Sequence, residues 1–120
     1  MRGRMLVVAL LGVGVIVFSA AQPSGAQDPK AGEKVYKLQC AKCHGEGGAG
    51  DGKEAAKLKE KPHDWTAGKG DLKTLDDAKM FEIISKGGPA VGKARTMPAY
   101  PKLSEGDVKN VVAFIKTFRK

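Results

Sequence analysis

The feature that most constrains the fold of this 120-residue chain is the pentapeptide CAKCH at residues 40–44. On a helical turn, Cys40 and Cys43 point to nearly the same side, and His44 follows directly. Two thiols at this spacing, followed at once by an imidazole, are typical of covalent c-type haem attachment. Each thiol can form a thioether with one vinyl group, while the neutral imidazole of His44 can bind the iron. So short a chain has little apolar surface to bury, and a covalently bound haem would complete its core.

Three other uses of these residues fit the sequence less well. A redox dithiol is expected in a thioredoxin-like βαβ context, and no alternating strands are predicted here. A zinc site could use Cys40, Cys43, His44 and His63. However, His44 directly follows Cys43, whereas the histidine ligands of a zinc finger are separated from its cysteines by several residues. A plain disulfide is compatible with an exported chain. The motif favours haem over all three.

The N-terminal segment has the pattern of a secretory signal. Basic Arg2 and Arg4 precede 17 uncharged residues at positions 5–21, and small residues at 24–26 precede Gln27. We therefore expect cleavage after residue 26 and a single domain over 27–120. An uncleaved membrane anchor stays open, because a spanning helix needs roughly 17–25 apolar residues. In either case the domain is expected on the periplasmic side, bound to the membrane only if residues 1–26 are retained.

The chain is basic, with a formal net charge of +8 at pH 7. A basic excess can indicate binding to nucleic acid, but export argues against that function. An acidic face on a protein partner fits better. The alternative is that scattered lysines only keep the protein soluble.

Patterned helices are expected at both ends of the domain. Asp28 predicts an N-cap, and Pro29 the first residue of a helix that runs into Cys40. The last helix is expected to begin after Ser104, with a capping box to Asp107. The predicted apolar stripes are Ala31, Val35 and Leu38 in the first helix, and Val108, Val111, Val112, Ile115 and Phe118 in the last.

The middle of the chain is expected to form loops and two shorter helices. Five glycines between residues 45 and 52 exclude regular structure there. A short basic helical stretch is predicted over 53–61. A capping box from Thr74 to Asp77 predicts another helix that carries Met80 on its apolar side.

Together these features resemble the mono-haem class I cytochromes c, in particular their short bacterial members, over residues 28–120. The resemblance implies an all-α fold with the haem in a crevice between three to five helices. The first and last helices would cross, and the N-terminal signal or anchor helix would lie outside the domain. The residues that carry the resemblance are Gly32 and Tyr36, the motif at 40–44, the run Met97, Pro98, Ala99 and Tyr100, and the last helix begun by Leu103 and Ser104.

The resemblance also implies one covalent haem c, with His44 as the proximal iron ligand and Met97 as the distal one. Met80 is a rival for the distal position. It lies on the apolar stripe of a helix, where methionine usually fills the core. Met97 instead lies in a loop beside a proline that limits its freedom. The expected haem surroundings are Pro62, whose carbonyl could accept the second imidazole N–H, with Trp65, Pro98 and Tyr100.

Such a site predicts electron transfer between periplasmic redox proteins rather than catalysis, because no iron position is open to a substrate. Two alternatives stay open. One is a membrane-anchored subunit of a respiratory or dehydrogenase complex. The other is a ligand-sensing or catalytic haem protein, if Met97 leaves the iron. The basic residues expected to border the haem edge and dock a partner are Lys42, Lys53, Lys93, Arg95 and Lys102.

Overall fold

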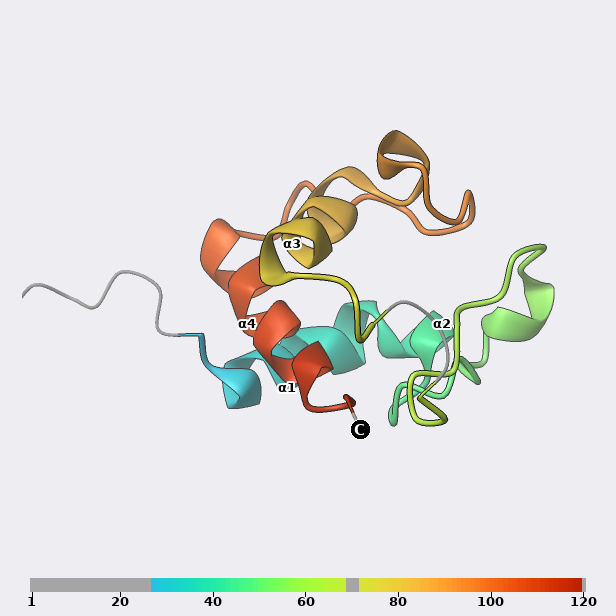
Figure 1. The fold of residues 1–120 in the computed structure, drawn as a ribbon, viewed down its shortest axis with the longest axis horizontal. Helices are drawn as coiled ribbons and strands as arrows, with labels where there is room; N and C mark the ends of the chain where they lie inside the picture. Colours follow the sequence, from blue (N-terminus) through green and yellow to red (C-terminus); the bar gives the residue numbers. More distant parts are fainter. Residues whose placement is uncertain (1–26, 69–71, 120) are drawn as a thin grey trace, which may run out of the picture.

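A computed structural model describes residues 27–68 and 72–119 (Figure 1). Within these ranges the chain is all-helical, as predicted, and contains no strand. The segment 1–26 lies outside them, so its role as signal or anchor stays a prediction. No helix in the described ranges has the length and apolar character needed to span a membrane. The elements are α1 (Pro29–Gln39), α2 (Ala41–His44), η1 (Ala55–Lys57), α3 (Asp77–Lys86), η2 (Pro89–Val91) and α4 (Glu105–Lys116), where η denotes a 3₁₀ helix.

Helix α1 begins where the sequence predicts. The Asp28 carboxylate accepts the backbone N–H of Lys30 at 2.9 Å, and Pro29 occupies the first turn. The buried side is formed by Gly32 and Tyr36. Leu38 is 78% exposed, so its assignment to the apolar stripe was wrong. It lies nearly opposite Tyr36 on a helix with 3.6 residues per turn.

Helices α1 and α4 cross at Gly32, as expected from the sequence (Figure 1). A Cβ atom at Gly32 would overlap the backbone carbonyl of Asn110 on α4. One turn later, the fully buried Tyr36 ring lies 5.1 Å from the Phe114 ring and 5.6 Å from the Phe118 ring, measured between centroids. The glycine therefore permits the close approach that brings these rings together.

Helix α4 supplies much of the core. Its capping box is confirmed, because the N–H of Asp107 donates to Ser104 Oγ at 3.1 Å and the N–H of Ser104 donates to Asp107 Oδ2 at 3.3 Å. The predicted apolar stripe is buried, with Phe118 partly buried at its end. The buried cluster consists of Tyr36, Cys40, Leu72, Met80, Ile84, Val108, Val111, Val112 and Ile115.

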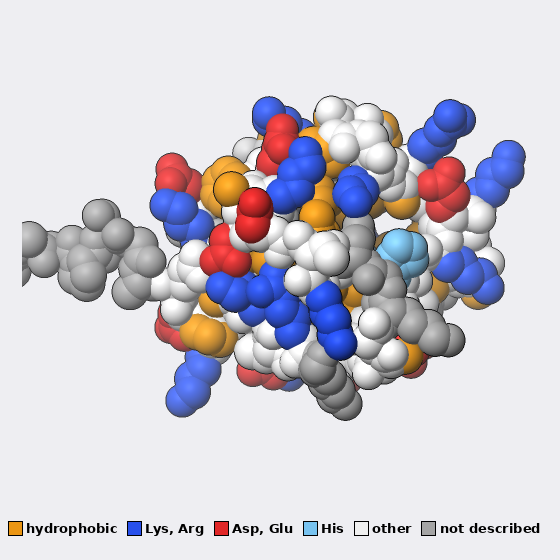
Figure 2. Space-filling model, in the orientation of Figure 1, with side chains coloured by type: hydrophobic (Ala, Val, Ile, Leu, Met, Phe, Trp, Pro, Cys, Tyr) orange, Lys and Arg blue, Asp and Glu red, His pale blue; other side chains and the backbone are white. Residues whose placement is uncertain are grey.

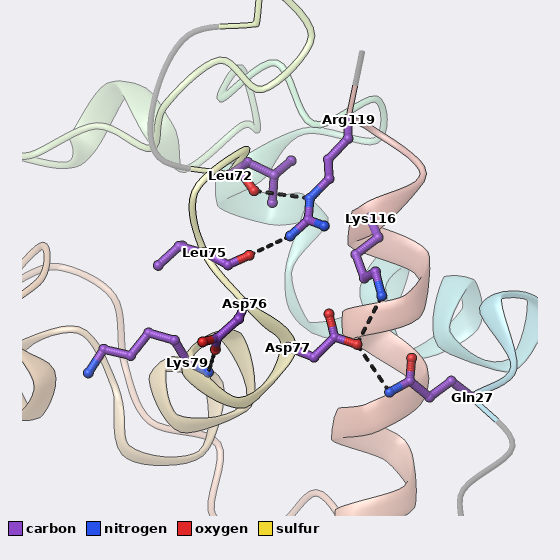
Figure 3. Close-up of polar contacts among 8 residues, drawn as sticks. All are labelled: Gln27, Leu72, Leu75, Asp76, Asp77, Lys79, Lys116 and Arg119. Atoms are coloured by element: carbon purple, nitrogen blue, oxygen red, sulfur yellow. Dashed lines mark hydrogen bonds and ion pairs between the residues drawn. The ribbon is translucent and has the colours of Figure 1, made fainter.

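Helix α3 begins later than predicted, and its N-cap is Asp76 rather than Thr74 (Figure 3). A helix capped by Thr74 would pair the N–H of Lys79 with the carbonyl of Leu75. Instead that N–H donates to Asp76 Oδ1 at 2.7 Å, and the Leu75 carbonyl accepts from the Arg119 guanidinium. A contact from the far end of the chain thus occupies the carbonyl that a longer helix would use.

The helical stretch predicted over 53–61 is reduced to the single turn of η1. The preceding chain folds back on α2, where the N–H of Gly52 donates to the Cys43 carbonyl at 3.2 Å and that of Glu54 to the Lys42 carbonyl at 2.8 Å. After η1 the backbone becomes extended at Leu58. Residues 58–65 then run along the cavity described next.

Candidate haem site

The predicted site residues come together around one cavity of about 160 Å³. It lies between the end of α1, helix α2 and the segments 58–65 and 93–100. A second cavity of about 60 Å³ adjoins it on the side of α3 and α4, and Cys40, His44 and Met97 border both. All eight predicted residues line the larger cavity: Cys40, Cys43, His44, Pro62, Trp65, Met97, Pro98 and Tyr100.

The two cysteines are presented by the junction of α1 and α2. Cys40 ends α1, and its carbonyl accepts the N–H of His44 at 3.0 Å, so the motif forms the predicted helical turn. Both cysteines carry free thiols, so the disulfide alternative is not realised in this structure. Burial, with a smaller contribution from Cys43, raises the pKa of the Cys40 thiol to about 11. A thiol held protonated at neutral pH is a poor redox nucleophile, which disfavours the dithiol alternative.

His44 is held at the end of α2 by its neighbours. The Tyr36 hydroxyl donates to the carbonyl of the next residue, Gly45, at 2.7 Å. Gly45 ends the helix with φ at 80°, a conformation that favours glycine. Burial, and to a smaller extent the nearby His63, lowers the pKa of His44 to about 4. The imidazole is therefore neutral at pH 7, the form that binds a metal ion.

The Nδ1 atom of His44 is buried and has no hydrogen-bond partner among the described residues. Nδ1 therefore does not make the bond expected from the imidazole to the Pro62 carbonyl, although Pro62 lines the cavity. A buried polar atom is normally paired, so an orphaned imidazole nitrogen calls for an explanation. Metal binding would explain the unpaired nitrogen, because His44 lines the same cavity as two thiols and a thioether.

Trp65 packs against the imidazole, a contact that the sequence did not reveal. Its ring stacks on His44 with centroids 4.6 Å apart and planes 17° apart, and it reaches Phe118 at 6.1 Å. The backbone N–H of Trp65 donates to the Gly48 carbonyl at 2.9 Å, which links the tryptophan to the glycine-rich loop. Trp65 therefore joins the candidate ligand to the aromatic cluster between α1 and α4.

Met97 and Met80 occupy different environments. Met80 is 4% exposed, belongs to the core and borders only the smaller cavity. Met97 borders both cavities from a loop, and its carbonyl accepts the N–H of Gly88 at 3.0 Å. Farther along this loop, the Tyr100 hydroxyl donates to the Gln39 carbonyl at 3.1 Å, next to Cys40. This placement favours Met97 as a ligand and Met80 as core.

The donor set fits a c-type haem better than zinc. Two thiols suited to thioether formation, an unpaired imidazole and a loop methionine border one cavity. By contrast, residues 27–68 and 72–119 contain no group of three or more His, Cys, Asp or Glu side chains placed to hold a metal ion. The four-ligand zinc site that includes His63 therefore has no support.

Basic side chains stand at the mouth of the cavity. Of the five predicted rim residues, only Lys93 lines the cavity. Lys42, Lys53, Arg95 and Lys102 are exposed but do not line it, whereas Lys61, which sequence reasoning missed, does. Figure 2 shows Lys and Arg side chains projecting at the end of the molecule formed by the segments around η1 and η2.

Comparison with known proteins gives a family match and two similar proteins. Residues 27–115 match the family described as cytochrome c oxidase, cbb3-type, subunit III. Cytochrome c6 of Picosynechococcus sp. is 31% identical over 118 residues, which cover 93% of this chain and 91% of that protein. A chain of the Kuenenia stuttgartiensis reducing HAO-like protein complex has a TM-score of 0.62 and 34% identity, over 75% of this chain and 42% of that chain. This protein thus spans less than half of that larger chain.

A family match over most of the chain, and a relative of similar length, agree with the helical fold and with the CAKCH motif. The family implies a c-type haem and redox partners, and its members transfer electrons without catalysing a reaction. This chain therefore belongs to the cytochrome c family and is a cytochrome c-type electron carrier.

Proposed function

We propose that the protein carries one electron on a single haem c, which Cys40 and Cys43 would bind covalently and whose iron His44 and Met97 would bind. The observation that carries this proposal is that all four side chains line one cavity, where the imidazole has a buried nitrogen without a partner. When bound, the haem would supply a reversible one-electron change between ferrous and ferric iron.

The residues of the chain would hold this site rigid. The hydrogen bond from Tyr36 to Gly45 and the stack of Trp65 on His44 restrict the imidazole. The hydrogen bond from Gly88 restricts the loop of Met97. Small movements of His44 and Met97 between oxidation states would favour rapid electron transfer, and an iron held by both side chains would leave no position for a substrate.

The proposed partners are redox proteins with an acidic face, docked at the basic cavity mouth near Lys61 and Lys93. Such docking would be brief and would weaken with rising salt concentration. We place the protein in the periplasm, with residues 1–26 removed as a signal peptide. Measured transfer rates that do not change with ionic strength would contradict charge-guided docking.

The match to an oxidase subunit family favours a second candidate, in which the domain is a membrane-anchored subunit of a respiratory complex. The N-terminus of the mature protein separates the two. A soluble fraction beginning at Gln27 supports the free carrier. A membrane fraction that retains Met1 supports the anchored subunit.

The methionine assignment is tested by substituting each sulfur. Met97→Ala should abolish the long-wavelength absorption band of the oxidised iron–thioether pair, while Met80→Ala should keep it. The two variants are matched because each removes one methionine that borders the smaller cavity. The reverse result would assign the ligand to Met80.

A further inference from the structure

The mouth of the larger cavity lies between two segments that are distant in the sequence. One wall comes from residues 58–65 and the other from residues 93–98. Figure 1 shows these segments, green and orange respectively, extending toward the same end of the molecule. Whatever holds the two walls together therefore determines how easily the cavity opens.

Glu60 joins the two walls with two hydrogen bonds. Its carboxylate Oε2 accepts the backbone N–H of Arg95 at 3.0 Å, across 35 positions in the sequence. Its backbone carbonyl accepts the hydroxyl of Thr96 at 2.7 Å. Both contacts are made to the two residues that immediately precede Met97.

The opposite side of the Met97 loop is tied to the end of α3. Gly88 donates its N–H to the Met97 carbonyl at 3.0 Å, and its own carbonyl accepts the N–H of Lys93 at 2.8 Å. These bonds link the loop to Gly88, which lies between α3 and η2, whereas the bonds of Glu60 link the loop to the facing wall. Glu60 thus completes the attachment of the methionine segment across the cavity.

We propose that Glu60 is a positioning residue, which keeps the Met97 segment closed over the haem without touching the iron. This inference rests on the proposed function, in which Met97 binds the iron. Loss of the Glu60 contacts would let the segment leave more often, so that an external ligand could reach the vacated position. Glu60 would therefore limit how often an external ligand can bind to the haem and so help to keep the protein an electron carrier.

The expected effect can be estimated from the two hydrogen bonds. Both hydrogen bonds are exposed, so we assign each the middle of the usual range for the net stabilisation by one hydrogen bond. This corresponds to about a fivefold change in the equilibrium between the closed and the open loop. Glu60→Ala removes the bond to Arg95, and Thr96→Val removes the hydroxyl with little change in shape. Each should raise the open fraction of the loop about fivefold.

The experiment measures carbon monoxide binding to the reduced haem protein by stopped flow, together with the unfolding midpoint. Glu60→Ala and Thr96→Val should each bind carbon monoxide about fivefold faster than the unsubstituted protein, with a smaller effect for Glu60→Gln, which retains an acceptor. Glu54→Ala is the matched control, because Glu54 is a nearby acid that pairs with Lys57. It should bind at the original rate.

A second readout does not depend on the iron. Amide hydrogen exchange at Arg95 should be about fivefold faster in Glu60→Ala and unchanged in Glu54→Ala. Unchanged carbon monoxide binding and unchanged exchange at Arg95 in Glu60→Ala would overturn the proposal. So would a lower unfolding midpoint without faster binding, because that result assigns Glu60 a purely structural role. Absence of the long-wavelength band from the unsubstituted protein would instead overturn Met97 ligation itself.

Discussion

Replacing Gly32 with alanine tests the helix crossing on which the haem motif is built. An added Cβ would overlap the Asn110 carbonyl and lie 2.9 Å from the backbone nitrogen of Val111. These are backbone atoms in α4 and cannot rotate away, so α1 would have to move outward. Overpacking of this kind costs about 3 kcal/mol at the upper end of its usual range. Alanine has a higher helix propensity than glycine, and this offsets up to about 1 kcal/mol of the cost.

The expected net loss is about 2 kcal/mol, which lowers the Tm of a domain of this size by roughly 8–16 °C. Thermal unfolding followed by circular dichroism measures it. Gly106→Ala is the control, because Gly106 also lies in a helix but a Cβ there meets only Ser104 Oγ, at 3.9 Å. The control should unfold at the same temperature or higher. A Tm for Gly32→Ala equal to that of the parent protein, or an equal loss in both variants, would refute the reasoning.

Three further substitutions test other parts of the structure. Met80→Ala should cost about 2–5 kcal/mol of unfolding free energy in a denaturant titration, because it opens a cavity in the core. Tyr36→Phe leaves the Gly45 carbonyl without its buried donor and should cost about 1–3 kcal/mol, and a loss near zero in the same titration would contradict this. The hydrogen bond from Lys116 lowers the pKa of Asp77 from its ordinary value of 3.8, so this carboxylate stabilises the fold above that pH. Asp77→Asn should therefore be less stable than the parent by under about 1 kcal/mol at pH 7, with the difference vanishing as the pH falls through the lowered pKa. An equal difference at acid pH would contradict it.

The parts of the fold that could be predicted from the sequence are those fixed by neighbouring residues. Asp28 caps α1 and Ser104 caps α4 because each has its partner within three positions. The CAKCH turn is equally local. Gly32 indicated a crossing because a glycine one turn before a large aromatic residue leaves room for a second helix.

The failures have a common physical origin in contacts between distant segments. Leu38 fits a helical stripe by spacing alone, but the approach of α4 at Gly32 determines which side of α1 is buried. Thr74 and Asp76 can both cap a helix, and Asp76 does so while Arg119 binds the Leu75 carbonyl that a helix begun at Thr74 would use. No sequence pattern carries such information.

In the candidate site, too, local features could be predicted from the sequence and contacts between distant segments could not. The sequence identified the four residues proposed to hold the haem, because their chemistry is carried by short motifs. It did not reveal the stack of Trp65 on His44 or the attachment of Glu60 to the Met97 segment. Exposed glutamates have no pattern that marks a partner 35 positions away.

The covalent attachment of one haem is tested by the mass of the intact, denatured polypeptide, produced in a host that matures c-type cytochromes. The expected mass is that of the processed chain plus one haem, retained through denaturation because Cys40 and Cys43 would bind it covalently. The mass of the bare chain, or one lower by the hydrogens lost on forming a disulfide, would contradict it.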